Sequence, residues 1–323
     1  MTHDSSTLTL LSSIAKLFGI SAVGYLSVRF RLVSESVIRA ISKFVIFVTL
    51  PCLIIATLGA KLELNMLVTL GRAAGAALAL NAAGLCLALL IRRAFIGRHE
   101  NGRTLFLSLS SIQNAGYLPI PLVAAVLPAE LRSQGLLITF VYIMVMGAIF
   151  WSLGVWLITE GSEKNWRKNV KNVVNPPIMA ILFGLLFLIA PFKDGFSGMN
   201  FLVKSLTFLG SATVPLVMVV LGGSFGSAMA IHAGEGRIVT VATAVKLLVI
   251  PCVALIAVKT FAIDYTSGFV LMLEASMPAA LNHVVVVRQY GGNVSLTSRA
   301  LFVQYMASIV TIPLFLYLFN LKV

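Results

Sequence analysis

The residues that could do chemistry lie in two apolar segments that proline interrupts. One reads LSSIQNAGYLPIP from Leu109 to Pro121, and the other reads EASMPAALNH from Glu274 to His283. Proline removes a backbone donor and disrupts the helix around it. In a lipid environment the freed backbone groups need partners in protein or in a watery cavity. The two segments therefore predict half-helices whose dipoles attract ions.

Glu274 is an acidic residue deep in an apolar segment, where a charged side chain is expensive and usually functional. Its carboxyl group could exchange a proton or bind a cation, and the alternative is a structural partner for a buried lysine. His283 is a second candidate proton carrier, because imidazole titrates near neutral pH. A buried structural histidine is the alternative for His283.

Asn114 and Asn282 lie at near-equivalent points of the two interruptions. An amide can donate to a carboxylate and also accept from a cation, so we predict substrate or cation ligands, with capping of the broken helices as the alternative. Further candidates are Gln113, Tyr117, Lys43 and Lys246 for the substrate, Ser111 and Ser276 for the coupling cation or proton, and Pro119, Pro121 and Pro278 for the helix breaks.

The composition indicates the elements that must hold these residues. Of 323 residues, 59% are hydrophobic and 11% are charged, whereas soluble proteins carry about 25% charged residues. A water-soluble enzyme is therefore excluded. At about 20 residues per crossing, we expect an all-α polytopic membrane protein with ten segments. These are roughly 8–28, 38–60, 67–91, 104–128, 133–158, 175–192, 199–223, 237–260, 267–289 and 297–320.

The net charge of +13 is scattered along the chain rather than concentrated in a nucleic-acid groove. Lys and Arg are more frequent in the connections on one side of the predicted membrane, and such residues mark the cytoplasmic side. We therefore expect an integral inner-membrane protein with both termini outside, in the periplasm. A nucleic-acid partner is not expected.

Several landmarks recur at nearly one offset, which indicates an internal repeat. VTLPCLIIATLG around Pro51 matches ATVPLVMVVLGG around Pro215, and FVYIM matches FVQYM. Five segments per repeat is an odd number, so the second repeat must enter the membrane from the opposite side. We predict a first repeat over 1–158, a short cytoplasmic linker over 159–174 and an inverted repeat over 175–323.

Four strings resemble the auxin efflux carrier family, whose bacterial members include proteins described as malonate or other organic-acid carriers. They are NAGYLPIPL, the NPP that begins at Asn175, VPLVMVVLGGSF and MPAALNHVVVVRQYGG. The resemblance implies ten helices in two inverted five-helix repeats, related to the bile acid/sodium symporters. In that arrangement helices 4 and 9 are broken and cross, and the substrate binds beside the crossing.

The resemblance also carries over single residues. It matches Asn114, Ile120 and Pro121 to the crossing of the plant carriers, and it matches Glu274 to a glutamate that binds sodium in the bile acid symporters. It thus implies Na+ at Glu274 and Asn114. It further implies that segments 3–5 and 8–10 move against segments 1, 2, 6 and 7.

We therefore predict a secondary active transporter for a small organic anion, such as malonate or an auxin-like acid, coupled to protons or sodium. An uncoupled channel for organic anions is the first alternative, and a membrane sensor or enzyme is the less favoured one. The sequence contains neither GxxxxGK[ST] nor HExxH, and we expect no enzymatic activity and no resident cofactor or metal. The expected partners are the anion and the lipid bilayer, with a homodimer left open.

Overall fold

A computed structural model describes residues 3–96, 102–159, 175–188, 195–196, 198–225, 236–261, 263–290 and 292–320. Within these ranges each of the ten predicted apolar segments contains helix, and two of them, 104–128 and 267–289, are interrupted by non-helical stretches. The helices group into two compact units, each of which takes residues from both halves of the sequence.

Unit 1 consists of Met1–Ala73, Gly116–Met144 and Val174–Ser227. It contains α1 (His3–Arg29), α2 (Glu35–Phe44), η1 (Val45–Thr49), α3 (Leu50–Lys61), η2 (Leu64–Met66), α6 (Pro119–Val126), α10 (Pro176–Gly184), η5 (Leu185–Leu188), α12 (Asn200–Ser211) and α13 (Thr213–Phe225). The first parts of α4 (Leu67–Phe95) and α7 (Ala129–Ile149) also belong to it.

Unit 2 consists of Ala74–Ala115, Val145–Val173 and Ala228–Val323. Besides the remainders of α4 and α7, it contains α5 (Arg103–Ser111), η3 (Phe150–Gly154), α8 (Val155–Ile158), α14 (Gly236–Ala244), η6 (Val245–Val249), α15 (Ile250–Thr260), α16 (Tyr265–Ala275), α17 (Asn282–Tyr290) and α18 (Val294–Asn320).

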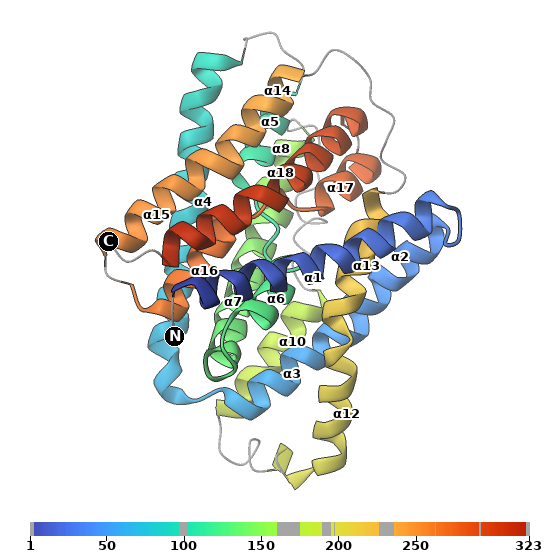
Figure 1. Cartoon of the computed structure of the whole chain (residues 1–323), viewed down its shortest axis with the longest axis vertical. Helices are drawn as coiled ribbons and strands as arrows, with labels where there is room; N and C mark the ends of the chain where they lie inside the picture. Colours follow the sequence, from blue (N-terminus) through green and yellow to red (C-terminus); the bar gives the residue numbers. More distant parts are fainter. Residues whose placement is uncertain are drawn as a thin grey trace. The chain divides into compact units, whose positions relative to one another are not determined.

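In unit 1, α1 packs against α13, although the two helices lie far apart in the sequence (Figure 1). Glycine allows the close approach. A Cβ atom at Gly222 would overlap the carbonyl oxygen of Ser21, and one at Gly24 would overlap that of Val219. Small residues at such contacts let helix backbones approach closely, as is common in membrane proteins.

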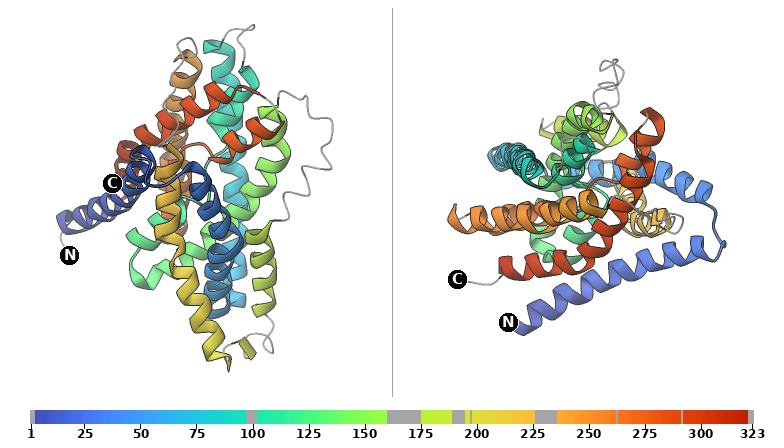
Figure 2. Two further views of the ribbon diagram at one scale, coloured as in Figure 1. Left: turned by 90° about the vertical axis from the view of Figure 1, so that its right-hand side faces the viewer. Right: turned by 90° about the horizontal axis from the view of Figure 1, so that it is seen from above.

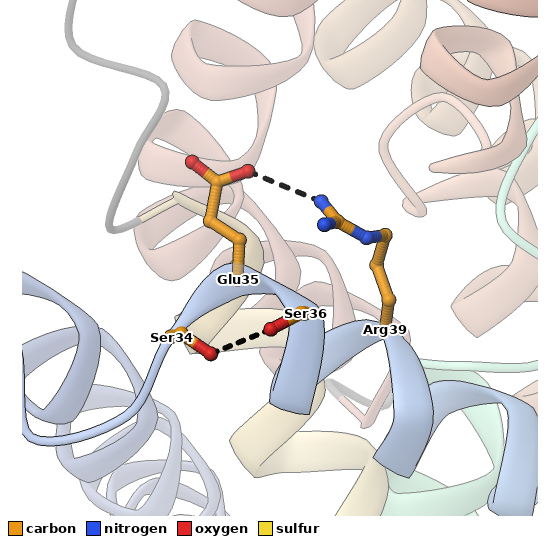
Figure 3. A network of polar contacts seen from close by, with 4 residues as sticks. All are labelled: Ser34, Glu35, Ser36 and Arg39. Atoms are coloured by element: carbon orange, nitrogen blue, oxygen red, sulfur yellow. Dashed lines mark hydrogen bonds and ion pairs between the residues drawn. The ribbon is translucent and has the colours of Figure 1, made fainter.

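The start of α2 shows the solvent-facing chemistry of unit 1 (Figure 3). Ser34 lies at the N-cap, and its hydroxyl forms a hydrogen bond of 2.7 Å with that of Ser36. Glu35 lies in the first turn, where a negative charge complements the helix dipole. Arg39 forms an ion pair of 3.3 Å with Glu35. Both side chains are exposed, so we expect this pair to add little stability.

In unit 2, α18 runs alongside α14 and α15 and also contacts α16 and α17 (Figures 1 and 2). One helix from the end of the chain therefore touches both halves of the interrupted 267–289 segment. It also contacts α5 and η6, which places it at the centre of the polar residues described below.

Side-chain caps set the beginnings of two helices. The Asn175 side chain accepts a hydrogen bond of 3.2 Å from the backbone N–H of Ile178, at the start of α10. The Asp264 carboxylate accepts one of 3.0 Å from the backbone N–H of Ser267, at the start of α16. Such caps satisfy amide groups that have no partner inside the helix. The NPP string therefore begins a helix, with its prolines in the first turn.

Two prolines explain two wide helical turns. Pro51 and Pro251 are each the second residue of a helix, α3 and α15, and each follows a five-residue π-helical turn, η1 and η6. The proline ring removes a donor and clashes with the carbonyl four residues earlier, so the backbone widens there. Turns of this kind are frequent at functional sites, and η6 carries Lys246.

In the part of the chain that the structure describes, six helical stretches are long and apolar enough to cross a membrane. They are Glu35–Lys61, Leu64–Phe95, Ala129–Ile158, Asn200–Phe225, Gly236–Thr260 and Val294–Asn320, and the stretch Pro176–Leu188 is apolar but shorter. The helical membrane-protein class is thus confirmed, while ten crossings in two inverted repeats stay a prediction. Of the predicted 159–174 linker, residues 160–174 lie outside the described residues.

Candidate functional site

Two helices are interrupted where the sequence concentrates its polar residues. α5 ends at Ser111 and α6 begins at Pro119, while α16 ends at Ala275 and α17 begins at Asn282. The first interruption precedes Pro119 and Pro121, which lie in the first turn of α6, where the missing donor costs little. Pro278 lies inside the second interruption, between α16 and α17.

The two non-helical stretches pair with each other inside unit 2. Gln113 and Ala279 form an isolated antiparallel bridge. The backbone N–H of Asn114 donates to the Pro278 carbonyl at 2.9 Å, and that of Ala280 donates to the Ile112 carbonyl at 3.4 Å. Backbone groups freed by the helix breaks thus find partners in each other, as an apolar environment demands. We call this region the crossing, residues 112–115 and 276–281.

α18 completes the crossing with Gln304, which is fully buried. Its side-chain oxygen accepts a hydrogen bond of 2.8 Å from the backbone N–H of Ala279, and its Nε2 donates to the Leu109 carbonyl at 3.2 Å. Leu109 lies in the last turn of α5, where carbonyls have no partner within the helix. Gln304 therefore joins both interrupted helices.

Two more contacts fix the same region. The Asn114 side-chain amide donates to the Tyr305 hydroxyl at 2.6 Å. His283 lies within hydrogen-bond distance of the Ala280 carbonyl through Nδ1, at 2.6 Å, and of the Ser108 hydroxyl through Nε2, at 2.8 Å. A carbonyl can only accept, so Nδ1 carries the hydrogen. In the neutral ring Nε2 then accepts from Ser108. Both imidazole nitrogens are occupied by structural contacts.

A second set of polar side chains near the crossing is buried without hydrogen-bond partners. Glu274, Lys246 and Gln113 are at most 1% exposed. The Glu274 carboxylate, the Lys246 ammonium and the Gln113 amide have no hydrogen-bond partner. The Gln113 amide lies beside the Glu274 carboxylate and Lys246 is within electrostatic range of it, although no hydrogen bond of standard geometry joins the three side chains. These three residues, which we call the unpartnered triad, all belong to unit 2.

The smaller candidates in unit 2 are placed as follows. The Ser111 hydroxyl donates to the Leu107 carbonyl at 2.7 Å, and the Ser276 hydroxyl donates to the Met272 carbonyl at 2.8 Å. Each serine can therefore offer a ligand only its oxygen lone pairs. Asn282 is the first residue of α17 and is half-buried.

Two predicted substrate ligands belong to unit 1 instead. The Tyr117 hydroxyl forms a hydrogen bond of 3.1 Å with that of Ser42. Lys43, the next residue along α2, is exposed. The boundary between the units falls between Ala115 and Gly116. Tyr117 and Lys43 thus belong to unit 1 and are not members of the unpartnered triad.

The helix ends explain why charges gather here. Glu274 lies in the last turn of α16, where the partial charge of the dipole is negative and favours a cation. α5 also ends at the crossing, while α17 begins there. In unit 2 the crossing therefore offers two helix C-terminal ends to a cation and one N-terminal end to an anion.

Sequence reasoning missed three residues of this region: Gln304, Tyr305 and Ser108. Gln304 carried a usable signal, because a glutamine inside an apolar span usually faces protein or a cavity. It also lies in the FVQYM string that matches FVYIM. Ser108 gave no comparable signal, since its partner His283 lies 175 residues away in the sequence.

A family model described as "Membrane transport protein" matches residues 9–316. The chain belongs to this family of membrane transport proteins. The family includes the auxin efflux carriers, so the resemblance seen in the sequence is confirmed. The chain is a transmembrane transporter and not an enzyme.

Its relatives agree with this assignment. An uncharacterized transporter of Methanothermobacter thermautotrophicus is 28% identical over 216 residues, which cover 67% of this chain and 68% of that protein. An uncharacterized transporter of Methanocaldococcus jannaschii is 25% identical over 90% of this chain and 93% of its own length. Protein PIN-LIKES 2 of Arabidopsis thaliana is 28% identical over 46% of this chain and 35% of its own.

One string of the transporter matches a hydrolase motif without its structural context. GGSFG, which begins at Gly222, fits G-x-S-x-G. In hydrolases that motif forms a sharp strand-to-helix turn that exposes the serine. Here Ser224 lies within α13, and its hydroxyl donates to the Val220 carbonyl at 2.7 Å. The serine is therefore an ordinary helical residue.

Proposed function

We propose that this transporter moves a small organic anion, of the monocarboxylate or dicarboxylate class, by alternating access at the crossing. The observation that carries the proposal is the unpartnered triad. Buried polar groups are nearly always hydrogen-bonded, and exceptions need an explanation. Glu274, Lys246 and Gln113 lie beside two interrupted helices, which is where secondary transporters bind substrates and ions.

The anion would be held by positive groups of the crossing. The beginning of α17, with Asn282, supplies the positive end of a helix dipole. Asn114 and Lys246 can contribute an amide donor and an ammonium. Lys43 and Tyr117, which belong to unit 1, stay substrate ligands predicted from the sequence. Malonate and auxin-like acids, which the sequence resemblance suggests, are the first compounds to test.

Glu274 would couple anion movement to a cation, a proton or sodium. Its carboxylate has no hydrogen-bond partner, so proton or cation binding would remove an uncompensated buried charge. His283 is the second candidate proton carrier, with Ser111 and Ser276 as lesser cation ligands. An uncoupled channel for organic anions is the alternative function, and it gives Glu274 no role in driving uptake.

The division into units supports a moving part and a static part. Unit 2 holds most of α4 together with α5, α8 and α14–α18, and unit 1 holds α1–α3, α10, α12 and α13. This resembles the partition expected from the sequence, except that α6 and most of α7 group with unit 1. The inner-membrane location, both termini outside and a homodimer belong to the same proposal.

The test is uptake by proteoliposomes that contain the purified protein. A thermal-shift screen of carboxylic acids first selects a binding anion, whose radiolabelled form is then followed under imposed proton or sodium gradients. We expect accumulation above equilibrium, and we expect Glu274→Gln to abolish it. Glu130→Gln is the matched control, because Glu130 is exposed at the start of α7.

Two results would contradict coupled transport. Uptake that never exceeds equilibrium and ignores ionophores would identify an uncoupled channel. Full accumulation by Glu274→Gln would remove that carboxylate from the coupling step. The absence of any flux for all acids that bind would contradict anion transport itself.

A further inference from the structure

Two buried threonines of unit 1 lie where two long helices touch. Thr49 belongs to the wide turn η1 and Thr213 is the first residue of α13, and both are 0% exposed. Neither hydroxyl has a hydrogen-bond partner within the protein. We propose that the two hydroxyls together bind one buried water molecule, which links the two helices. The inference concerns unit 1 alone and goes beyond the proposed function.

The helices that carry the two threonines run antiparallel, with α2 against α13 and α3 against α12 (Figure 1). Two close approaches fix the register. A Cβ atom at Gly210 would lie 2.8 Å from the Cα of Leu53. One at Gly223 would lie 2.5 Å from the Cδ1 of Ile38. The position opposite a residue therefore falls along one helix as it rises along the other.

This register brings the two threonines to the same level. Thr49 lies four residues before Leu53, and Thr213 lies three residues after Gly210. Counted from that contact in opposite directions, the two positions face each other to within one residue. The wide turn η1 also contacts α13 directly. Two unpartnered, fully buried hydroxyls therefore share one place between the helices.

Both hydroxyls lack the partner that a helical threonine usually finds in its own backbone. Such a hydroxyl commonly donates to the carbonyl four residues earlier, as Thr57 of α3 and Thr207 of α12 do at 2.7 and 2.8 Å. Thr49 lies in a turn of wider register. Thr213 begins a helix, because α12 ends at Ser211. Each threonine therefore keeps its hydroxyl for another partner.

The surroundings favour a neutral partner over an ion. Among the described residues of unit 1, the buried polar side chains all end in hydroxyl groups. They are Ser21, Thr49, Thr139, Tyr142 and Thr213. An ion buried among them would have no compensating charge, which is costly. A water molecule is neutral, and it can accept from a hydroxyl while it donates to another oxygen.

The backbone gives the water a second use. Pro51 follows Thr49 by two residues, and Pro215 follows Thr213 at the same spacing. Proline removes a backbone donor from its helix. In membrane helices threonine side chains and ordered waters can satisfy the backbone groups that proline frees. Since a buried water typically makes about three hydrogen bonds, it can serve both hydroxyls and a freed carbonyl.

The experiment compares the Tm of the purified protein with those of Thr49→Val, Thr213→Val and the double variant. Valine keeps the shape of threonine and removes the hydroxyl. We expect each single variant to lower Tm by roughly 2–4 °C, because the water loses a partner and the other hydroxyl stays buried without one. The double variant should be no less stable than either single variant, since no unpaired hydroxyl is left.

Thr139→Val is the matched control. Thr139 is 0% exposed in α7, and its hydroxyl donates to the Gly135 carbonyl at 2.8 Å. Its effect on Tm should add to that of Thr49→Val, because the two sites share no ligand. Single variants at Thr49 and Thr213 that each raise Tm, with additive effects, would show two independent dry hydroxyls and overturn the proposal. So would a double variant that fails to fold while Thr139→Val folds.

Two further measurements identify the ligand. A high-resolution cryo-EM map of the wild-type protein should show one peak within hydrogen-bond distance of both hydroxyls, and the double variant should lack it. A map in which the hydroxyls contact each other directly, or one without the peak, would overturn the water site. Wild-type Tm should also be equal in NaCl, KCl and N-methyl-D-glucamine chloride at one ionic strength. A sodium-specific rise that Thr49→Val abolishes would identify a cation instead and overturn the proposal.

These readouts are separate from transport. If Thr49→Val abolished the thermal shift caused by a carboxylic acid, the pair would belong to the anion site, and the water assignment would be wrong. The coupled Tm changes and the map peak would conversely stand even if no carboxylate were ever transported. The water site and the proposed function therefore fail independently.

Discussion

Two buried glutamines near the same crossing have opposite environments. Gln304 is 0% exposed and Gln113 is 1% exposed. Gln304 uses both ends of its amide, to Ala279 and to Leu109. Neither the oxygen nor the nitrogen of the Gln113 amide has a hydrogen-bond partner. The same residue type thus has two roles. Gln304 holds the interrupted helices together, whereas the Gln113 amide is left available for a ligand.

The contrast extends to the neighbours of each glutamine. On the bonded side, Tyr305 receives the Asn114 amide, and His283 is joined to Ser108. On the unbonded side lie Glu274 and Lys246, the most costly side chains to bury. A protein that can satisfy one half of a polar cluster so fully has no structural reason to leave the other half unsatisfied. We infer that Gln304 and Tyr305 maintain the shape, whereas Gln113, Glu274 and Lys246 are the side chains left for binding.

The largest expected effect on stability comes from Gln304→Leu. The variant leaves two buried backbone groups without a partner, the Ala279 N–H and the Leu109 carbonyl. Each buried group left unsatisfied costs about 1–3 kcal/mol. We expect a loss of about 2–6 kcal/mol, measured as a fall in Tm of the detergent-solubilised protein. Gln134→Leu, at a half-buried glutamine of α7, is the control. An unchanged Tm for Gln304→Leu would mean that the crossing does not depend on α18.

A smaller loss is expected for His283→Gln. The variant cannot reproduce the contacts to Ala280 and Ser108 together, so we expect a loss of about 1–3 kcal/mol. If the histidine is structural, the pH profile of anion uptake should keep its shape while Tm falls. A displaced pH profile with little change in Tm would instead make His283 the second proton carrier.

Tyr305→Phe tests the hydrogen bond between the Asn114 amide and the Tyr305 hydroxyl. The variant keeps the ring and removes the hydroxyl that accepts from the Asn114 amide at 2.6 Å. We expect a loss of about 1 kcal/mol, with uptake reduced only in proportion to the folded fraction. The exposed Tyr317 of α18 supplies the matched control, Tyr317→Phe. A loss of anion binding in Tyr305→Phe without a fall in Tm would place Tyr305 on the binding side of the comparison.

Much of the helical architecture could be predicted from the sequence because membrane helices are read from length and hydropathy. The interrupted segments were visible as prolines and polar residues inside apolar runs, for example LPIP at the start of α6 and SMPAAL before α17. Local patterns of this kind depend on neighbours in the chain. The start of the first interruption was less clear, because the break begins at Ile112, ahead of both prolines.

Long-range pairing could not be predicted. Gln304 contacts Leu109 across 195 residues, and Asn114 contacts Tyr305 across 191. Nothing local distinguishes a glutamine that will find two backbone partners from one that will find none. The grouping of Tyr117 with unit 1, and of Gln113 with unit 2, likewise depends on tertiary structure. The sequence therefore indicated which residues are polar and buried, but not which of them are bonded.

Gln113→Leu sharpens this distinction with the smallest expected effect on stability. Because its amide has no hydrogen-bond partner, replacement by an apolar side chain of similar size leaves no protein group newly unsatisfied. Such replacements are nearly neutral or stabilising. We expect Tm to stay within about 2 °C of wild type, because no hydrogen bond of standard geometry is lost. Anion uptake should fall sharply, because the leucine cannot bond the substrate or the coupling ion. Equal losses of Tm for Gln113→Leu and Gln304→Leu would show that both glutamines are structural, and full uptake by Gln113→Leu would exclude its amide from the transport site.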